Sequence, residues 1–277
     1  MWYLLFAAVA AAQECVSVSW ASQTPMAKPG GWNKCVGSGH AYLVLRKGYA
    51  EQLAMAHREL GVNYVRFHGI FDDDVGVWKG VKGTYDFTNV KRIYDVVMNA
   101  GVKPFVELSF MPATLAMNSR TVFAYGAHTA PPKDWSAWGD MMEAFTRFLV
   151  QTYGMDEVKT WPFEVWNEPN CGFYTPSDSK PGQRVEGCEM GSGDLTGPNG
   201  YMQMYRVTAS AVKRVSLNIK VGGPASAQLG LLNSFMRHCI EEGLPLDFVS
   251  ALPFRRTRGL RLSYGSRNIF VIRHNLN

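Results

Sequence analysis

From about residue 49 onward, segments with helical spacing of apolar residues alternate with short strand-like segments, and this alternation limits the possible folds most. Gly61 and Gly101 are placed to end two of the helices, and Asp134 is placed to cap the start of another. The expected helices are residues 49–60, 88–100, 134–153, 200–215 and 229–242. The expected strands are residues 63–68, 103–110, 161–168, 220–223 and 246–250, with a first strand within residues 15–44.

Strands and helices that alternate in this way pair their strands in parallel through right-handed crossovers. A doubly wound sheet and a (β/α)8 barrel both fit the pattern. Short buried strands followed by long loops favour the barrel, whose active site lies at the carboxyl ends of its strands. The prediction is an α/β fold, a (β/α)8 TIM-type barrel that is incomplete, with about six of the eight βα units.

The charge of the chain is concentrated at its end. Residues 251–277 hold six arginines and no Asp or Glu, whereas residues 1–250 hold 22 Lys and Arg against 23 Asp and Glu. A body with a net charge of −1 lacks the basic surface that nucleic-acid binding requires, so no nucleic-acid partner is expected. Aromatic residues make up 13% of the chain, which suits stacking on sugar rings and equally suits a large core.

Residues 1–12 form an apolar run that ends in small residues. The run is shorter than the roughly 20 residues that a membrane-spanning helix needs, so it is interpreted as a secretory signal peptide, with a buried first strand as the alternative. Secretion would allow disulfide bonds, and two local ones are predicted, Cys15–Cys35 and Cys171–Cys188. Cys239 is left as a buried thiol. No cysteine or histidine cluster indicates a metal site, and no cofactor is expected.

The motif with the clearest chemical content is Trp161-Pro-Phe-Glu-Val-Trp-Asn-Glu-Pro-Asn170. Alternate residues of a strand face the same way, so Glu164, Trp166 and Glu168 are expected on one face. Pro169 indicates that the strand ends at Glu168. A carboxyl group at that end of a barrel strand, between aromatic rings, suits a general acid, and Asn167 beside it suits a sugar hydroxyl.

Together with five other segments, this motif resembles glycoside hydrolase family 39, the β-xylosidase and α-L-iduronidase family. The resemblance extends from about Trp32 to Ser250. The other segments are Cys35-Val-Gly-Ser-Gly39, Tyr64-Val-Arg-Phe-His-Gly-Ile-Phe-Asp-Asp-Asp-Val-Gly76, Tyr85-Asp-Phe-Thr88, Pro104-Phe-Val-Glu-Leu-Ser-Phe-Met-Pro112 and Val221-Gly-Gly-Pro224.

Membership would imply a (β/α)8 barrel and hydrolysis of a glycosidic bond with retention of configuration. The resemblance implies that Glu168 is the acid/base, that Asn167 binds the sugar 2-hydroxyl, and that Arg66 and His68 line the glycone subsite. A histidine that only fills the core is the alternative for His68. Glu107 is expected to be a structural acid that faces inward, with substrate contact as the alternative. Residues 72–74 are expected to be a solvated loop, with a subsite wall as the alternative.

The resemblance ends after Asp247-Phe-Val-Ser250, where the family continues with a strand end that contains histidine. This chain reads Ala251-Leu-Pro-Phe-Arg-Arg-Thr-Arg258 instead, and no Asp or Glu follows. Retaining hydrolysis needs a second carboxylate about 5–5.5 Å from the first, as nucleophile, and the family carries it on a later strand. The nucleophile is therefore expected to be absent. A frameshift, a retained intron and an alternative exon are the open explanations, and residues 269–272 are the candidate strand for pairing with one edge of the open sheet.

The expected organisation is a signal peptide (1–12), a partial catalytic barrel (13–250) and an aberrant Arg-rich tail (251–277). The expected function is that of a secreted, retaining, β-xylosidase-like glycoside hydrolase with a carbohydrate substrate, in a chain that is inactive by itself. Two alternatives stay open. One is a catalytically dead sugar-binding barrel, and the other is a barrel hydrolase of the cellulase or mannanase type with the same Asn-Glu-Pro strand.

Overall fold

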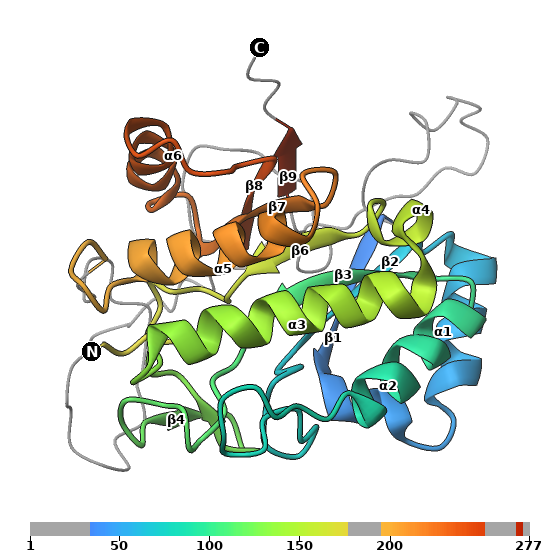
Figure 1. The fold of residues 1–277 in the computed structure, drawn as a ribbon. Coiled ribbons are helices and arrows are strands. Elements are labelled where there is room, and N and C mark those ends of the chain that lie inside the picture. The colour runs from blue at the N-terminus through green and yellow to red at the C-terminus, as the bar shows by residue number, and fades with distance from the viewer. Residues whose placement is uncertain (1–33, 177–194, 253–269, 274–277) are drawn as a thin grey trace, which may run out of the picture. The chain divides into compact units, whose positions relative to one another are not determined.

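One sheet organises the residues that the computed structural model describes, which are 34–176, 195–252 and 270–273 (Figure 1). Its strand order is β1-β2-β3-β6-β7-β8-β9, and the first six strands run parallel in chain order. The parallel strands are β1 (Cys35–His40), β2 (Tyr64–His68), β3 (Lys103–Leu108), β6 (Pro162–Val165), β7 (Lys220–Ala227) and β8 (Phe248–Leu252). The sheet is that of an incomplete (β/α)8-type barrel, as the sequence predicts.

Strand β9 (Phe270–Arg273) pairs with the edge of this sheet in the opposite direction to its neighbour. Its backbone lies antiparallel to β8, with Phe248 opposite Arg273 and Ala251 opposite Phe270. The expected pairing of residues 269–272 with one edge of the sheet is therefore confirmed, with bounds shifted by one residue.

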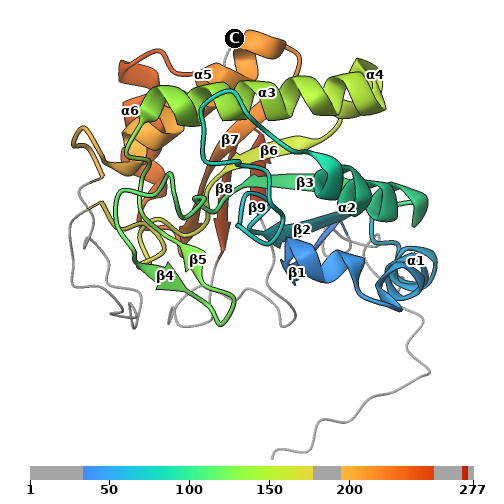
Figure 2. The same cartoon turned by 60° about the horizontal axis from the view of Figure 1, so that its bottom comes forward.

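Helices connect consecutive parallel strands, and α3 lies beside α5 across one face of the sheet (Figures 1 and 2). The helices are η2 (Ala41–Leu45, a 3-10 turn), α1 (Tyr49–Leu60), α2 (Thr88–Asn99), α3 (Trp135–Tyr153), α4 (Met155–Val158), α5 (Tyr201–Val215) and α6 (Leu232–Glu241). A short antiparallel hairpin of β4 (Thr121–Val122) and β5 (Ala127–His128) lies between β3 and α3 in the chain.

Local chemistry fixes the ends of two of these helices. The Asp134 carboxylate accepts hydrogen bonds from the backbone N–H groups of Ser136 at 2.9 Å and Ala137 at 3.0 Å, which satisfies two donors of the first turn of α3. Gly61 ends α1 in a left-handed conformation, with φ of 68°. The sequence predicted both signals and their positions.

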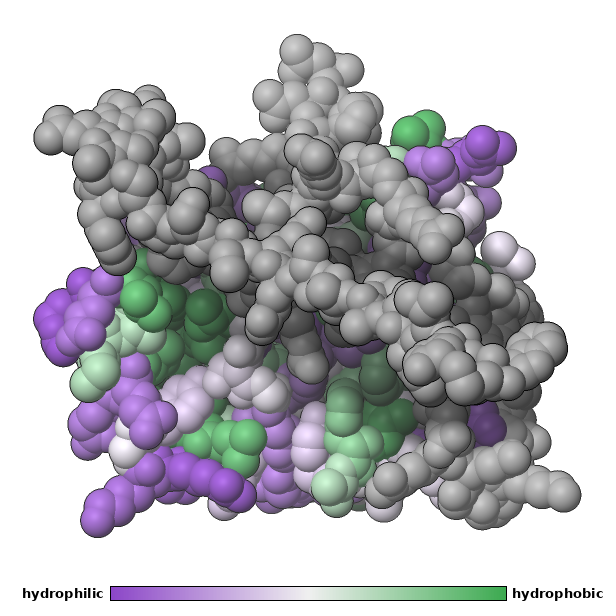
Figure 3. All heavy atoms as spheres, turned by 180° about the vertical axis from the view of Figure 1, so that it is seen from behind, coloured by the Kyte–Doolittle hydropathy of each residue, from purple (hydrophilic) through white to green (hydrophobic). Residues whose placement is uncertain are grey.

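Large apolar side chains fill the space between the sheet and α3. Trp138 of α3, Phe145 of α3 and Trp161 before β6 are fully buried there. The Trp138 indole N–H donates to the Thr208 hydroxyl of α5 at 2.8 Å, so the one polar atom of this ring has a partner. On the side opposite α3 and α5, apolar patches of the described surface alternate with polar ones (Figure 3).

Candidate active site

An ion-pair cluster forms the floor of the candidate site, between the middle strands of the sheet. Glu107 of β3 lies directly opposite Glu164 of β6 in the strand register, and Arg66 of β2 reaches both. Arg66 Nη1 lies 2.6 Å from Glu107 Oε2, and Arg66 Nε donates to Glu164 Oε2 at 2.6 Å. All three side chains are buried, and Arg66 is 4% exposed. Glu107 is thus the inward-facing acid that the sequence predicts.

The cluster holds its charges by mutual attraction against the cost of burial. Burial raises the pKa of the Glu107 carboxyl, but Arg66 and His68 outweigh this effect, and the net pKa is lowered. For Glu164 burial is the stronger effect, with repulsion from Glu107 added, and its pKa is raised in spite of Arg66. Burial alone would lower the pKa of Arg66, but Glu107 and Glu164 raise it, so the guanidinium stays charged.

His68 and Asn167 lie next to this floor and are oriented by it. His68 Nδ1 lies 2.8 Å from Glu107 Oε2, and an ionised Glu107 accepts a hydrogen bond from Nδ1–H, which orients the imidazole ring. Arg66 Nη2 donates to Asn167 Oδ1 at 3.1 Å, which leaves the amide N–H groups of Asn167 as donors. Arg66, His68 and Asn167, predicted together from the sequence, are therefore brought together.

The strand that carries the Asn-Glu-Pro motif ends earlier than the sequence predicts. β6 stops at Val165, and both Trp166 (φ 69°) and Glu168 (φ 41°) adopt left-handed backbone conformations. The expectation that Glu164, Trp166 and Glu168 share one face is therefore wrong, because period-2 alternation holds only along an extended backbone. Trp166 instead packs against Trp138 of α3, on the helix side of the sheet, whereas Glu164 faces Arg66.

The turn after β6 is held by contacts that cross to other elements. Glu168 is 5% exposed, and its backbone N–H donates to the Ala225 carbonyl of β7 at 3.0 Å. The Trp166 indole N–H donates to the Phe173 carbonyl at 2.6 Å. Non-glycine residues in left-handed conformations persist where their surroundings fix them, and they cluster at functional sites. Glu168 thus lies past the carboxyl end of β6, held next to β7.

A second histidine, which sequence reasoning missed, lies at the end of β1. His40 pairs with His68 in the β1–β2 register, and its Nε2 lies 3.2 Å from Asp72 Oδ2 and 3.4 Å from Asp74 Oδ1. Its ring stacks on Tyr125 at 3.9 Å with 2° between the planes. The sequence contains a signal for this histidine, because His40 directly follows the strand-like Val-Gly-Ser-Gly segment, and barrel enzymes carry functional side chains at the carboxyl ends of strands.

The loop after β2 is only partly as expected. Asp73 and Asp74 are exposed, which agrees with a solvated loop, but Asp72 is buried, and burial raises the pKa of its carboxyl against the opposing effect of His40. The expectation of a solvated loop is therefore wrong for Asp72, since the chain turns at Gly69 and brings its carboxylate against His40.

The cysteines agree with one expectation and contradict another. Cys35 is a free thiol on β1, so the predicted Cys15–Cys35 disulfide is wrong. Burial raises the pKa of the Cys35 thiol to about 12. Arg66 lowers this pKa and Glu164 raises it, both by smaller amounts, so the thiol lies near the ion-pair cluster. Cys239 is a free, buried thiol, as predicted. Cys171 is buried after Glu168, and Cys188 and Cys15 lie outside the described residues.

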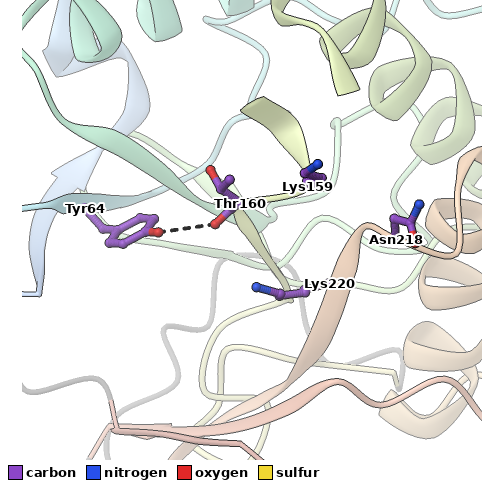
Figure 4. Close-up of a pocket in the computed structure, with 5 residues that line it drawn as sticks. All are labelled: Tyr64, Lys159, Thr160, Asn218 and Lys220. Atoms are coloured by element: carbon purple, nitrogen blue, oxygen red, sulfur yellow. Dashed lines mark hydrogen bonds between the residues drawn. The ribbon is translucent and has the colours of Figure 1, made fainter. Parts of the chain in front are cut away.

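A cavity of about 480 Å³ lies at the opposite end of the strands from Glu168 (Figure 4). Its lining includes Tyr64 at the start of β2, Thr160 before β6 and Lys220 at the start of β7, and the Tyr64 hydroxyl donates to the Thr160 carbonyl at 3.2 Å. In barrels the catalytic residues come from the carboxyl ends of strands, so this cavity is separate from the candidate site.

Within residues 34–176, 195–252 and 270–273, no group of three or more His, Cys, Asp or Glu side chains has an arrangement that would hold a metal ion. Nor does any helix in these segments have the length and hydropathy needed to cross a membrane.

A parallel barrel-type sheet has the fold of (β/α)8 glycoside hydrolases, and Glu168 after β6 lies at the end of the strands where such enzymes carry their catalytic carboxyl groups. The model of the glycosyl hydrolases family 39 matches residues 21–264, and the chain belongs to this family.

Its relatives include β-xylosidases. The chain is 38% identical over 222 residues to the beta-xylosidase of Caldicellulosiruptor saccharolyticus and 36% identical over 227 residues to that of Geobacillus stearothermophilus, in both cases over 79% of this chain and 42% of the relative. A crystal structure of a monomeric beta-xylosidase from Caulobacter crescentus CB15 superposes with a TM-score of 0.69 at 34% identity, over 80% of this chain and 41% of that one. The chain therefore spans about two fifths of the length of these relatives.

Proposed function

We propose that this chain carries the acid/base half of a retaining β-xylosidase-type active site, with Glu168 as the acid/base. The observation that carries the proposal is the position of Glu168, past the carboxyl end of β6 and beside an Asn167 whose amide is oriented by Arg66. In this proposal Glu168 donates its proton to the glycosidic oxygen as the bond to the anomeric carbon breaks. Asn167 donates to the sugar 2-hydroxyl and His68 contacts the glycone.

Arg66 acts in this scheme mainly through its neighbours. Three of the five N–H donors of a guanidinium are directed at Glu107, Glu164 and Asn167. The cation therefore fixes the direction of the Asn167 amide and neutralises the floor on which the glycone lies.

The nucleophile that retaining hydrolysis requires supports a narrower proposal for the chain by itself. The anomeric carbon must be attacked by a carboxylate from the face opposite the acid. Glu107 and Glu164 are both tied to Arg66 in the floor of the sheet, and the sequence has no Asp or Glu after residue 250. We therefore propose that the chain as given binds saccharides without hydrolysing them by the retaining mechanism.

The charges at the carboxyl ends of β1, β2 and β3 favour a neutral glycone. Asp72, Asp74 and Glu107 bring negative charge to this end of the strands. Arg66 is the cation that the described residues place there, and its two carboxylate partners already neutralise it. A uronide would bring a further carboxylate to this region and be repelled, so a β-xyloside is proposed as the substrate rather than a uronide.

The remaining proposals concern processing and organisation. We propose that residues 1–12 are a signal peptide, that the protein enters the secretory pathway, and that Cys171 and Cys188 form a disulfide next to the Glu168 loop. We further propose that the catalytic region comprises residues 13–250 and that residues 251–277 are an aberrant Arg-rich tail, of which β9 pairs with β8. Peptide mapping of non-reduced, secreted protein tests the signal cleavage and the disulfide together.

The catalytic proposal is tested in a fusion that joins residues 1–250 to the C-terminal part of the Caldicellulosiruptor saccharolyticus β-xylosidase. Glu168→Gln should lower kcat/KM about 10²- to 10⁴-fold on methyl β-xyloside, the usual contribution of general acid catalysis, and far less on an activated nitrophenyl β-xyloside. The reason is that only the poor leaving group needs a proton. Glu59→Gln, on the exposed end of α1, is the matched control. Equal losses on both substrates would contradict an acid role for Glu168.

A further inference from the structure

Two aromatic side chains are exposed at the tip of the β4–β5 hairpin. Phe123 and Tyr125 lie in the turn between the two strands and are 40% and 38% exposed. Their rings stack on each other at 5.2 Å. Exposed aromatic rings that are stacked in this way form a flat apolar surface of the kind on which planar or ring-shaped ligands bind.

This surface adjoins the candidate site on three sides. Phe123 stacks on His68 at 5.6 Å and on Phe173 at 5.3 Å, and Tyr125 stacks on His40 at 3.9 Å. His40 and His68 end β1 and β2, whereas Phe173 belongs to the loop that follows Glu168. The hairpin therefore extends from the two histidines to the loop of the proposed acid.

A purely structural role explains this arrangement less well. Phe110, which also contacts Phe123, is fully buried and is an ordinary core residue, whereas Phe123 and Tyr125 keep more than a third of their surface in solvent. Phe123 also has a φ of 59°, a conformation that is unfavourable for a bulky side chain. Strain of this kind is retained where a side chain must point in a particular direction, which is common at binding sites.

The exposure of the site residues shows which part of a substrate the rings would meet. Arg66, Glu107 and Glu168 are almost fully buried, whereas Phe123 and Tyr125 are exposed, so a glycone that contacts the buried residues lies deeper than a group that reaches the hairpin. The glycosidic oxygen lies at Glu168, and the group beyond that oxygen lies further out. The exposed face of Phe123, stacked on the Phe173 loop, is placed to meet this outer group.

We propose that Phe123 and Tyr125 form the binding wall for the leaving-group side of the substrate, which is a second sugar or an aryl aglycone. This inference rests on the proposed function, because it takes Glu168 as the residue that faces the glycosidic oxygen. The wall acts through apolar stacking and therefore favours leaving groups with a flat or ring-shaped apolar face over a methyl group.

Titration calorimetry of the full chain with methyl β-xyloside and phenyl β-xyloside tests the proposal, because the two ligands differ only in the leaving group. Phe123→Leu and Tyr125→Leu should each weaken phenyl β-xyloside binding by about 3- to 10-fold, the usual size of an aromatic stacking interaction. Their affinity for methyl β-xyloside should stay within about twofold of that of the unsubstituted chain, a change too small to represent a lost stacking interaction. Tyr64→Leu, at the opposite end of β2, is the aromatic control and should change neither affinity.

The outcomes separate this inference from the proposed function. If the unsubstituted chain binds neither xyloside, the proposed function fails. If it binds both and the two hairpin variants leave phenyl β-xyloside binding unchanged, or lose affinity for both ligands equally, the leaving-group wall is wrong. Circular dichroism melting identifies a variant that does not fold, and the two variants are read independently, so one folded variant suffices for a decision.

Discussion

Replacing Arg66 by methionine should destabilise the protein far more than loss of an exposed ion pair. The substitution keeps much of the side-chain volume but removes the cation between Glu107 and Glu164, which lie 2.6 Å from it and are inaccessible to solvent. Breaking a buried ion pair by removing one partner costs about 3–5 kcal/mol, because the remaining charge stays buried and uncompensated. For a domain whose total stability is about 5–15 kcal/mol, that is a large fraction.

The loss should depend on pH in a defined direction. In the parent protein the pKa of Glu107 lies below its ordinary value of 4.5, so its stabilising contribution is present above that pH and declines as the pH falls through the lowered value. Without Arg66, burial raises the pKa of both carboxyls, and they can then take up protons in the folded state. The difference in unfolding free energy between parent and variant should therefore shrink as the pH falls from about 7 toward about 5. Protonation of the two carboxyls falls in this range because burial raises their pKa.

Urea unfolding followed by tryptophan fluorescence at the two pH values measures both effects. Arg147→Met is the matched control, because Arg147 also contacts a glutamate, Glu143 at 2.7 Å, but its side chain is 53% exposed. Its loss should be at most about 1 kcal/mol. The double variant Arg66→Met/Glu164→Gln should recover part of the Arg66 loss. An Arg66→Met protein that is no less stable than Arg147→Met, or whose loss is the same at both pH values, would refute the reasoning.

Two further predictions follow from local structure. Asp134→Ala removes the acceptor for two backbone donors of α3 and should cost about 1 kcal/mol in urea unfolding, whereas Asp134→Asn, which keeps an oxygen acceptor, should cost less. Cys35 and Cys239 should resist iodoacetamide at pH 8 in the folded protein, since burial raises the pKa of each thiol to about 12, and should react on unfolding in urea. Mass spectrometry of the alkylated peptides checks this, and rapid labelling of Cys35 in the native state would contradict the raised pKa of its thiol.

Sequence patterns specified those parts of the fold that depend on local signals. The bounds of α1 follow from helical spacing up to Gly61, and α3 begins after Asp134 because that side chain caps it. The order of the parallel strands follows from the alternation of elements. The meeting of Arg66, His68 and Asn167 was also predictable, because each lies near the carboxyl end of a parallel strand.

Features that depend on contacts between distant segments were not predictable in this way. The early end of β6 depends on left-handed backbone at Trp166 and on packing against Trp138 of another element. The burial of Asp72 depends on His40, which lies on a different strand. The residue types do not predict these features, since Trp is compatible with a strand and Asp with a loop. The end of β6 and the burial of Asp72 are determined by specific partners rather than by propensity.

The composition of one hydrogen-bonding edge of the sheet affects how readily it would recruit a strand from another molecule. The outermost strands of the described sheet are β9 and β1, and β1 pairs with β2 alone among the described residues. Strand β1 reads Cys-Val-Gly-Ser-Gly-His, and glycine is disfavoured in strands because it costs backbone entropy and offers no side chain for cross-strand contact. An edge of this composition is a poor template for intermolecular pairing. Self-association by addition of a strand at β1 is therefore disfavoured by Gly37 and Gly39, the two glycines that precede His40 in this strand.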